Sequence, residues 1–306
     1  MRIVSLLPSA TEIICSMGLR DQLVGVTHEC DYPPSVTGLP VVTQSFIPQD
    51  LDSAAIDALV RSQLSERRAL YTLRHDVLAS LQPDLIVSQA LCDVCAVAAD
   101  EVEQAACSLP GRPRVINLEP ARLEEVFDTI AVVGEAADQP EAAAQAIAGL
   151  RERVNAVCER SGGIAQSDKP RVAMLEWLDP LFNAGHWTPQ LVEMAGGHEC
   201  LGNPFEPSTR TRWEQLVASD ADVIFIAQCG FSTKRSLQDV SVLRKQPRWR
   251  ALKAVQSGRV FVADGNAYFS RSGPRLVDSM EILAHALHPQ VHPLPAGLSA
   301  ALQLTE

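Results

Sequence analysis

The chain has 306 residues, 46% of them hydrophobic and 21% charged, which is typical of a water-soluble globular protein with room for two ordinary domains. Its formal net charge of −11 repels phosphate backbones and anionic membrane surfaces, so nucleic acid is not an expected partner. The sequence holds no apolar run near the roughly 18 to 20 residues that span a bilayer. Eight cysteines in a chain of this length favour reduced thiols over a disulfide scaffold.

The first residues predict a strand followed by a helix. The apolar run that begins at Ile3 is interrupted by Pro8 and Glu12, before the core of a secretory signal would be complete. We therefore expect a cytoplasmic location, or a periplasmic one if a leader has been trimmed from this sequence. Ser9 and Glu12 have the spacing of a capping box, so Ser9 is expected to cap the helix, either as an ordinary cap or with amides that also contact a ligand.

Short runs rich in β-branched residues recur along the chain, each followed by turn residues and a helical pattern. They are residues 3–7, 23–26, 85–88, 115–118, 172–175, 223–227 and 260–263. Strands that alternate with helices indicate parallel sheets covered on both faces, so the expected fold class is α/β. Residues 83–89 resemble 221–228, and 112–119 resemble 169–176, which favours two related lobes over one continuous sheet.

A long helix is predicted between the two halves, from Pro140 to Arg160, where Pro suits the first turn and Ser161-Gly162-Gly163 the end. We accordingly expect an N-terminal lobe at 1–139, a connecting helix at 140–161, a C-terminal lobe at 162–288 and an extended tail at 289–306. Residues 53–78 also have a helical pattern.

The loops after the strands are where a ligand is expected, because open α/β sheets bind ligands at the carboxyl ends of their strands. After the second strand, the loop at 27–34 carries His28, Cys30 and Tyr32. After the third lies Gln89, followed by Cys92 and Cys95. A lone Cys-x-x-Cys is a redox pair, half of a metal site, or two buried thiols. Together His28, Cys30, Cys92 and Cys95 could form a four-ligand zinc site, and this alternative stays open.

The second half contains all four tryptophans. Trp187, beside His186 and after Gly185, suits an apolar platform with one polar or coordinating group, although Trp187 could equally belong to the core. Trp213 and the loop 268–275 would add aromatic rings and cations. A second His-Glu-Cys triplet at 198–200 is attributed to chance. The usual motifs of nucleotide-binding, hydrolytic and zinc-peptidase sites are missing, so the chain is not expected to be an enzyme.

Several segments together resemble the cobalamin-binding substrate-binding proteins of ABC importers, in the class III periplasmic binding protein family. The likeness covers most of residues 1–288, and its segments are 2–12, 24–26, 31–34, 83–86, 182–185, 191–197, 213–216 and 272–275. The resemblance implies two Rossmann-like lobes with mainly parallel central sheets, joined by a single long α-helix, with the ligand held between the lobes.

The site residues implied by the resemblance lie at matching motif positions. They are Ser9, Tyr32, Gln89, Ala90, Leu91, Gly185, His186, Trp187, Trp213, Tyr268, Phe269 and Arg271 for the ligand, and Glu214 for docking to the transporter. We expect a monomer that binds a cobalamin-like corrinoid reversibly, requires no cofactor and has an ABC transporter permease as partner. The alternatives are a zinc protein or metal-assisted enzyme, a redox protein using Cys92 and Cys95, and a haem or iron-siderophore binder.

Overall fold

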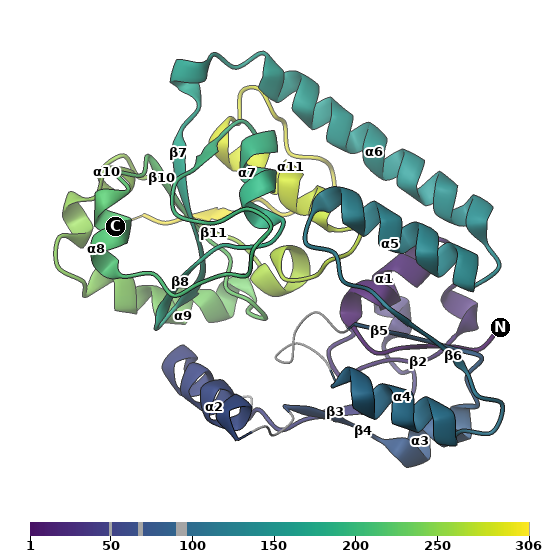
Figure 1. Cartoon of the computed structure of the whole chain (residues 1–306). Coiled ribbons are helices and arrows are strands. Elements are labelled where there is room, and N and C mark those ends of the chain that lie inside the picture. Colours follow the sequence, from purple (N-terminus) through teal and green to yellow (C-terminus); the bar gives the residue numbers. More distant parts are fainter. Residues whose placement is uncertain (49–50, 67–69, 90–96, 306) are drawn as a thin grey trace. The chain divides into compact units, whose positions relative to one another are not determined.

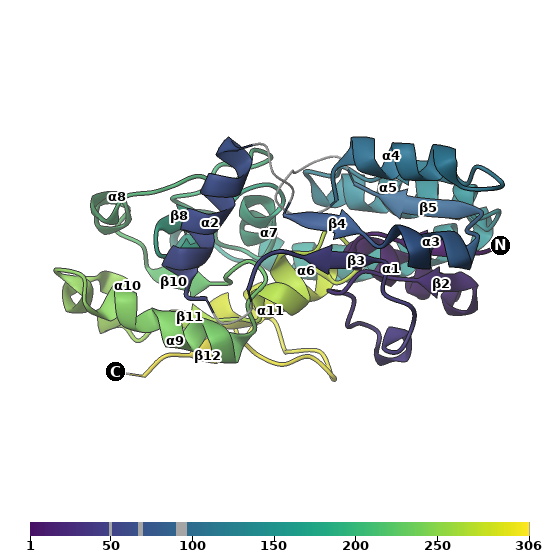
Figure 2. The ribbon, with the colours of Figure 1, turned by 90° about the horizontal axis from the view of Figure 1, so that it is seen from below.

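The computed structural model describes residues 1–48, 51–66, 70–89 and 97–305. Its chain divides into two compact units, which Figure 1 and, turned by 90°, Figure 2 show in sequence colours. Unit 1 comprises Met1–Leu51, Ala55–Pro120 and Glu124–Gly149, and unit 2 comprises Asp52–Ala54, Ala121–Leu123 and Leu150–Glu306. Within the described residues, no helix is both long and apolar enough to cross a membrane.

Unit 1 is built on a parallel sheet with the strand order β2-β1-β5-β6. Its strands are β1 (Ile3–Ser5), β2 (Leu23–Gly25), β5 (Leu85–Ser88) and β6 (Arg114–Asn117), and a separate antiparallel pair consists of β3 (Thr43–Ser45) and β4 (Tyr71–Leu73). Its helices are α1 (Pro8–Ser16), α2 (Ser53–Ser65), α3 (His75–Leu81), α4 (Ala99–Ser108) and α5 (Leu123–Ala136), with short 3-10 turns at Arg20–Gln22 and Pro34–Val36. One face of the sheet packs against α3 and α4, because Val4 and Ile86 share a buried cluster with Leu78 and Val102.

Unit 2 is built on a mixed sheet with the order β12-β11-β10-β7-β8, in which β9 also pairs with β7. Its strands are β7 (Arg171–Leu178), β8 (Leu181–Asn183), β9 (His198–Glu199), β10 (Val223–Ile226), β11 (Val260–Val262) and β12 (Leu302–Gln303). Its helices are α7 (Thr188–Met194), α8 (Trp213–Ala218), α9 (Thr233–Arg244), α10 (Lys253–Gln256) and α11 (Leu276–Leu287), with 3-10 turns at Gln166–Asp168 and Trp249–Ala251 and a π-helical turn at Gly265–Phe269. Ile224 and Val262 pack with Val240 of α9 and Ala254 of α10 in one buried cluster.

The long helix α6 (Pro140–Gly162) forms as predicted, and the boundary between the two units falls inside it, between Gly149 and Leu150. Proline occupies its first position, where the missing N–H costs no hydrogen bond. Leu150, Val154 and Val157, at spacings of three and four residues, are buried, as is typical of a helix with one packed face. The helix is thus held by packing along one face.

The α/β fold class is confirmed, and each of the seven predicted strands is present within a residue or three of its expected ends. The single helix expected over 53–78 is wrong. Helix α2 ends at Ser65, and Tyr71–Leu73 forms strand β4, which pairs antiparallel with β3. Because β4 makes its hydrogen bonds to a strand some thirty residues earlier, a local pattern could not reveal it.

The predicted capping box at the start of α1 is also wrong. Leu7 takes the cap position, no side chain caps the helix, and Ser9 lies inside the first turn with 4% of its surface exposed. Pro8, whose φ is preset for the first helical position, moves the helix start one residue earlier than Ser9.

Candidate functional site

The candidate site residues follow the carboxyl ends of the strands in each unit. In unit 1 the strand order reverses direction between β1 and β5, and in unit 2 between β7 and β10. Ligands of open α/β sheets bind beside such switch points. In unit 1 the described loops at this edge follow β1, β2 and β6, and in unit 2 they follow the parallel strands β7, β10 and β11. Strand β8 runs antiparallel to β7, so the loop that contains Gly185 leaves β8 in the opposite direction.

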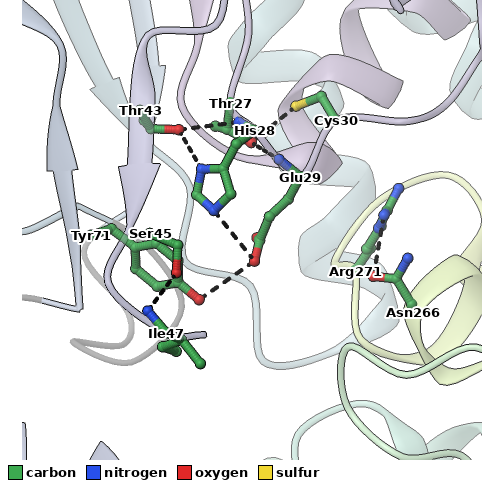
Figure 3. Close-up of polar contacts among 10 residues, drawn as sticks. All are labelled: Thr27, His28, Glu29, Cys30, Thr43, Ser45, Ile47, Tyr71, Asn266 and Arg271. Atoms are coloured by element: carbon green, nitrogen blue, oxygen red, sulfur yellow. Dashed lines mark hydrogen bonds and ion pairs between the residues drawn. The ribbon is translucent and has the colours of Figure 1, made fainter. Parts of the chain in front are cut away.

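The loop after β2 carries a directed chain of hydrogen bonds through Cys30 (Figure 3). Thr27 Oγ1 accepts a bond from the Glu29 N–H at 3.1 Å and lies 3.3 Å from Cys30 Sγ. Cys30 Sγ lies 3.1 Å from Thr11 Oγ1, and Thr11 donates to Ser5 Oγ at 2.8 Å. Thr11 donates its hydroxyl proton to Ser5, so the Cys30 S–H donates to Thr11. The Cys30 sulfur can then accept a hydrogen bond from the Thr27 hydroxyl. Cys30 is thus held as a thiol between two hydroxyls.

His28 is oriented by the β3–β4 pair in the same unit (Figure 3). Its backbone N–H donates to Thr43 Oγ1 at 3.2 Å, and its ring Nδ1 lies 2.8 Å from the same oxygen. The ring lies beside Tyr71, with centroids 5.5 Å apart, and Tyr71 donates to Glu29 Oε1 at 3.4 Å. Burial lowers the pKa of His28, and the neighbouring Glu29 raises it in part. The imidazole is therefore neutral at pH 7, the form that can coordinate a metal.

The predicted zinc site stays a prediction. Cys92 and Cys95 lie outside the described residues, as do Ala90 and Leu91 of the expected ligand loop. Among the residues that the structure describes, no group of three or more His, Cys, Asp or Glu side chains is placed to hold a metal ion. Gln89 is half-buried directly after β5, and Tyr32, with 44% of its surface exposed, follows β2.

In unit 2, the loop that contains Gly185 and His186 is fixed from two sides. The Gly185 N–H donates to Glu176 Oε1 at 3.2 Å, and the His186 N–H donates to the Glu206 carbonyl at 2.6 Å. A Cβ on Gly185 would lie 2.2 Å from the Ser208 nitrogen, so the two segments approach as closely as backbone allows. His186 has a φ of 50° and is half-buried, and burial lowers its pKa.

The predicted aromatic residues of unit 2 differ in their exposure. Trp187 is 8% exposed and donates from Nε1 to the Phe269 carbonyl at 3.0 Å, and Phe269 itself is 4% exposed. Trp213 is half-buried at the start of α8, and its Nε1 donates to the Pro247 carbonyl at 2.8 Å. Tyr268 is half-buried, with the Arg275 guanidinium 5.7 Å from its ring centroid. Tyr268 and Trp213 therefore present more surface than Trp187 and Phe269.

Arg271 and Glu214 complete the predicted set. Arg271 follows the π-helical turn, is 5% exposed and donates to Asn266 Oδ1 at 3.3 Å, as Figure 3 shows. Glu214 is exposed in the first turn of α8. Burying a charged guanidinium without hydrogen-bond partners costs free energy, and Asn266 supplies one such partner to Arg271 within unit 2.

Sequence reasoning missed a tilted pair of aromatic rings at the switch point of unit 2. Trp177 of β7 and Phe231 after β10 have ring centroids 4.9 Å apart, and the Arg235 guanidinium lies 4.3 Å from the Phe231 centroid. Both rings are half-buried. Trp177 is one of the four tryptophans that the sequence places in the second half, but only the pairing of β7 with β10 brings Phe231 beside it.

Two buried carboxyl groups organise the turns around this part of unit 2. Burial raises the pKa of Glu176 to about 7, although the Gly185 N–H, Ser208 and Thr188 each act to lower it. Burial likewise raises the pKa of Glu199 to about 7, and the amides of Leu201 and Gly202 donate to its Oε1 at 2.9 Å. The second His-Glu-Cys triplet therefore has a structural role, because its glutamate closes the turn after β9.

Comparison with known proteins identifies the relatives of this chain. The model of the periplasmic binding protein family matches residues 3–267. An uncharacterized ABC transporter substrate-binding lipoprotein of Bacillus subtilis, YvrC, is 23% identical over 94% of this chain and 80% of its own length. A vitamin B12-binding protein of Vibrio cholerae is 22% identical over 92% of this chain and 86% of its own length.

Among solved structures, a periplasmic heme binding protein from Pseudomonas aeruginosa superposes with a TM-score of 0.73 at 21% identity, covering 98% of this chain and 97% of that one. This likeness confirms the two-lobed α/β fold. The relatives are substrate-binding proteins rather than enzymes, as was predicted for this chain.

The expected cytoplasmic location is wrong. The matching family is one of periplasmic binding proteins, and a relative that spans nearly the whole chain is a substrate-binding lipoprotein, so the relatives are exported proteins. The prediction rested on the first dozen residues, which report on strand β1 and the start of α1 and not on the cellular location of the folded domain.

Proposed function

Because this chain belongs to the periplasmic binding protein family, we propose that it binds a cobalamin-like corrinoid reversibly and presents it to an ABC transporter permease. The family binds vitamin B12, haem or iron-siderophore ligands. The sequence relatives named for vitamin B12 support the corrinoid over the other two.

The observation that carries this proposal is the placement of aromatic and hydrogen-bonding groups after the strands of each unit. Unit 1 offers Tyr32, with 44% of its surface exposed, and unit 2 offers the half-buried Trp177 and Phe231 at its switch point. Flat rings suit the faces of a macrocycle, and neighbouring polar groups such as His186 suit its amide-bearing rim. We propose that both units contribute contacts to one ligand.

Calorimetric titration of the full chain with cyanocobalamin, dicyanocobinamide and haemin, with visible spectra of each mixture, tests the proposal. We expect saturable binding of at least one corrinoid with a Kd between about 1 µM and 1 nM, and weaker binding of haemin. Tighter binding of haemin than of both corrinoids would identify haem, and not a corrinoid, as the ligand. An absence of heat and of spectral change with all three would refute the proposal.

A variant tests whether the loop after β2 contacts the ligand. Loss of one aromatic contact typically costs about 1 to 2 kcal/mol, so we expect Tyr32→Ala to weaken cyanocobalamin binding about tenfold. Val132→Ala is the control, because Val132 is 42% exposed on helix α5, away from the ends of the strands. Equal affinities of the two variants would remove Tyr32 from the site.

A further inference from the structure

Glu176 occupies a junction between the predicted ligand loop and the rest of unit 2. Glu176 is half-buried, and its carboxyl group accepts a hydrogen bond from the Gly185 N–H at 3.2 Å. The Ser208 hydroxyl also stabilises its ionised form. One carboxylate thus joins strand β7, the loop at 185–188 and the segment at 206–208.

The loop at 185–188 has little freedom apart from this junction. Gly185 leaves no room for a side chain, His186 is held at a φ of 50°, and its N–H is bonded to the Glu206 carbonyl. Trp187 at its far end is anchored through Nε1 to Phe269. The Gly185 N–H therefore depends on the Glu176 carboxylate for its hydrogen bond.

We propose that Glu176 is a positioning residue that makes ligand affinity depend on pH: its ionised form holds Gly185, at the start of the 185–188 loop, in the binding conformation, and protonation weakens this hold. This inference rests on the proposed function, because it assigns the regulation of the same site. The ionised carboxylate is the form that accepts the stronger hydrogen bonds from the Gly185 N–H and Ser208 together.

The pKa of Glu176 lies within the pH range in which ligand binding can be measured on the folded protein. Burial raises its pKa to about 7, from the 4.5 of a free glutamate. The titratable side chains on the segments that bond or pair with it are His186, Glu206, Cys229, His198 and Glu199. Burial lowers the pKa of His186.

The expected size of the effect follows from the population of the ionised form. With a pKa near 7, about ten-elevenths of the molecules are ionised at pH 8 and about one-eleventh at pH 6. If only the ionised form binds, the apparent Kd rises about tenfold from pH 8 to pH 6. Higher affinity at pH 6 than at pH 8 would contradict this sign.

Titration with cyanocobalamin at pH 8, 7 and 6 is the binding test, with Glu176→Gln and Glu199→Gln compared to the unmodified chain. Gln at 176 keeps an acceptor oxygen but cannot titrate, so we expect its Kd to be constant across this range. Glu199→Gln is the matched control, since it removes a buried carboxyl group of similar pKa that bonds to Leu201 and Gly202 instead of Gly185. It should retain the tenfold dependence. The same dependence in Glu176→Gln would overturn the inference.

A measurement without ligand separates this inference from the proposed function. The backbone amide signals of Gly185 and His186 in a 15N NMR titration should shift with a midpoint near pH 7, and Glu176→Gln should abolish that shift. Ser208→Ala removes a group that stabilises the ionised form, so it should move the midpoint to higher pH. If these amides do not respond to pH near 7, the inference fails whatever the ligand is. If they respond but no corrinoid binds, only the proposed function fails.

Discussion

Gly185 lies where the loop after β8 meets the segment at 206–208 of unit 2. A Cβ built at this position would be 2.2 Å from the Ser208 nitrogen and 2.5 Å from the Glu206 carbonyl oxygen. Both neighbours are backbone atoms, so they cannot move aside as a flexible side chain would. The residue is required by close packing, because even a methyl group would separate the two segments.

Gly185→Ala is therefore expected to lower the free energy of unfolding by at least about 2 kcal/mol, through backbone displacement in a packed site. Gly149→Ala is the matched control, because Gly149 lies in the interior of helix α6 with open space around it. That change should be neutral or stabilise by up to about 1 kcal/mol. Urea unfolding of both variants decides the matter, and an unchanged midpoint for Gly185→Ala would contradict the packing argument.

His292 provides a residue-scale test of pH dependence. It is 2% exposed, its Nε2 lies 3.2 Å from Ser161 Oγ, and its Nδ1 is buried without a hydrogen-bond partner. Burial, together with His288, Arg160 and His285, lowers its pKa to about 4. Because the unfolded chain takes up the proton near pH 6.5 and the folded chain does not, the stability that neutral His292 contributes is lost as the pH falls from 6.5 towards 4.

His292→Gln should remove that loss. Between pH 7 and pH 5 the unmodified chain is expected to lose about 2 kcal/mol relative to this variant. Urea unfolding followed by tryptophan fluorescence reports on unit 2, since all four tryptophans lie there. His75→Gln, whose side chain is 60% exposed, is the control and should follow the unmodified chain. Parallel pH profiles for His292→Gln and the unmodified chain would show that His292 does not carry the acid sensitivity.

At the scale of elements, the ion cluster between α6 and α11 joins two helices of unit 2. Arg153 bonds through its guanidinium to Asp278 and to Glu281, whose side chains are 15% and 10% exposed. Burial raises the pKa of Asp278, although Arg153 acts to lower it. Since the arginine is the partner of both acids, its removal would leave two carboxylates close together and poorly hydrated.

Arg153→Met should lower the free energy of unfolding by about 2 kcal/mol at pH 7, a value below that of a fully buried pair because Arg153 is 39% exposed. The loss should shrink towards pH 4.5 as Asp278, whose pKa burial raises, takes up a proton. Arg151→Met on the exposed face of the same helix is the control, with an expected change within about 0.5 kcal/mol. A loss that stays constant with pH would rule out the electrostatic explanation.

The elements that sequence patterns identified are those with a local signal. The runs that became β5, β10 and β11 are continuous and apolar, as expected of strands buried on both faces, and α6 has a complete apolar stripe. The elements that were missed are short and depend on distant partners. Strand β4 pairs with β3, and β12 pairs with β11 from forty residues away, so neither could be recognised from its own residues.

At the scale of the whole molecule, each unit contains a buried hydrophobic cluster of its own. We expect calorimetry of the ligand-free chain to depart from a two-state transition, with a van't Hoff enthalpy below the calorimetric one. If both units contribute to the ligand site, cyanocobalamin at 100 times its Kd should stabilise the chain by about 2.7 kcal/mol and bring the transitions together. A shift confined to one transition would place the ligand on one unit only.

The sequence by itself determined the α/β class, the repeated strand–helix units, the long helix at 140–160 and the likeness to substrate-binding proteins. Each of these features produces a local periodicity or a contiguous motif in the sequence. Only the tertiary structure decided that Phe231 lies beside Trp177, that Thr43 orients His28, that Ser9 does not cap its helix and that Glu176 bonds to the loop of Gly185. These contacts join residues that are distant in the chain or depend on backbone geometry. Their pairing is set by strand order and close packing, which no single stretch of sequence contains.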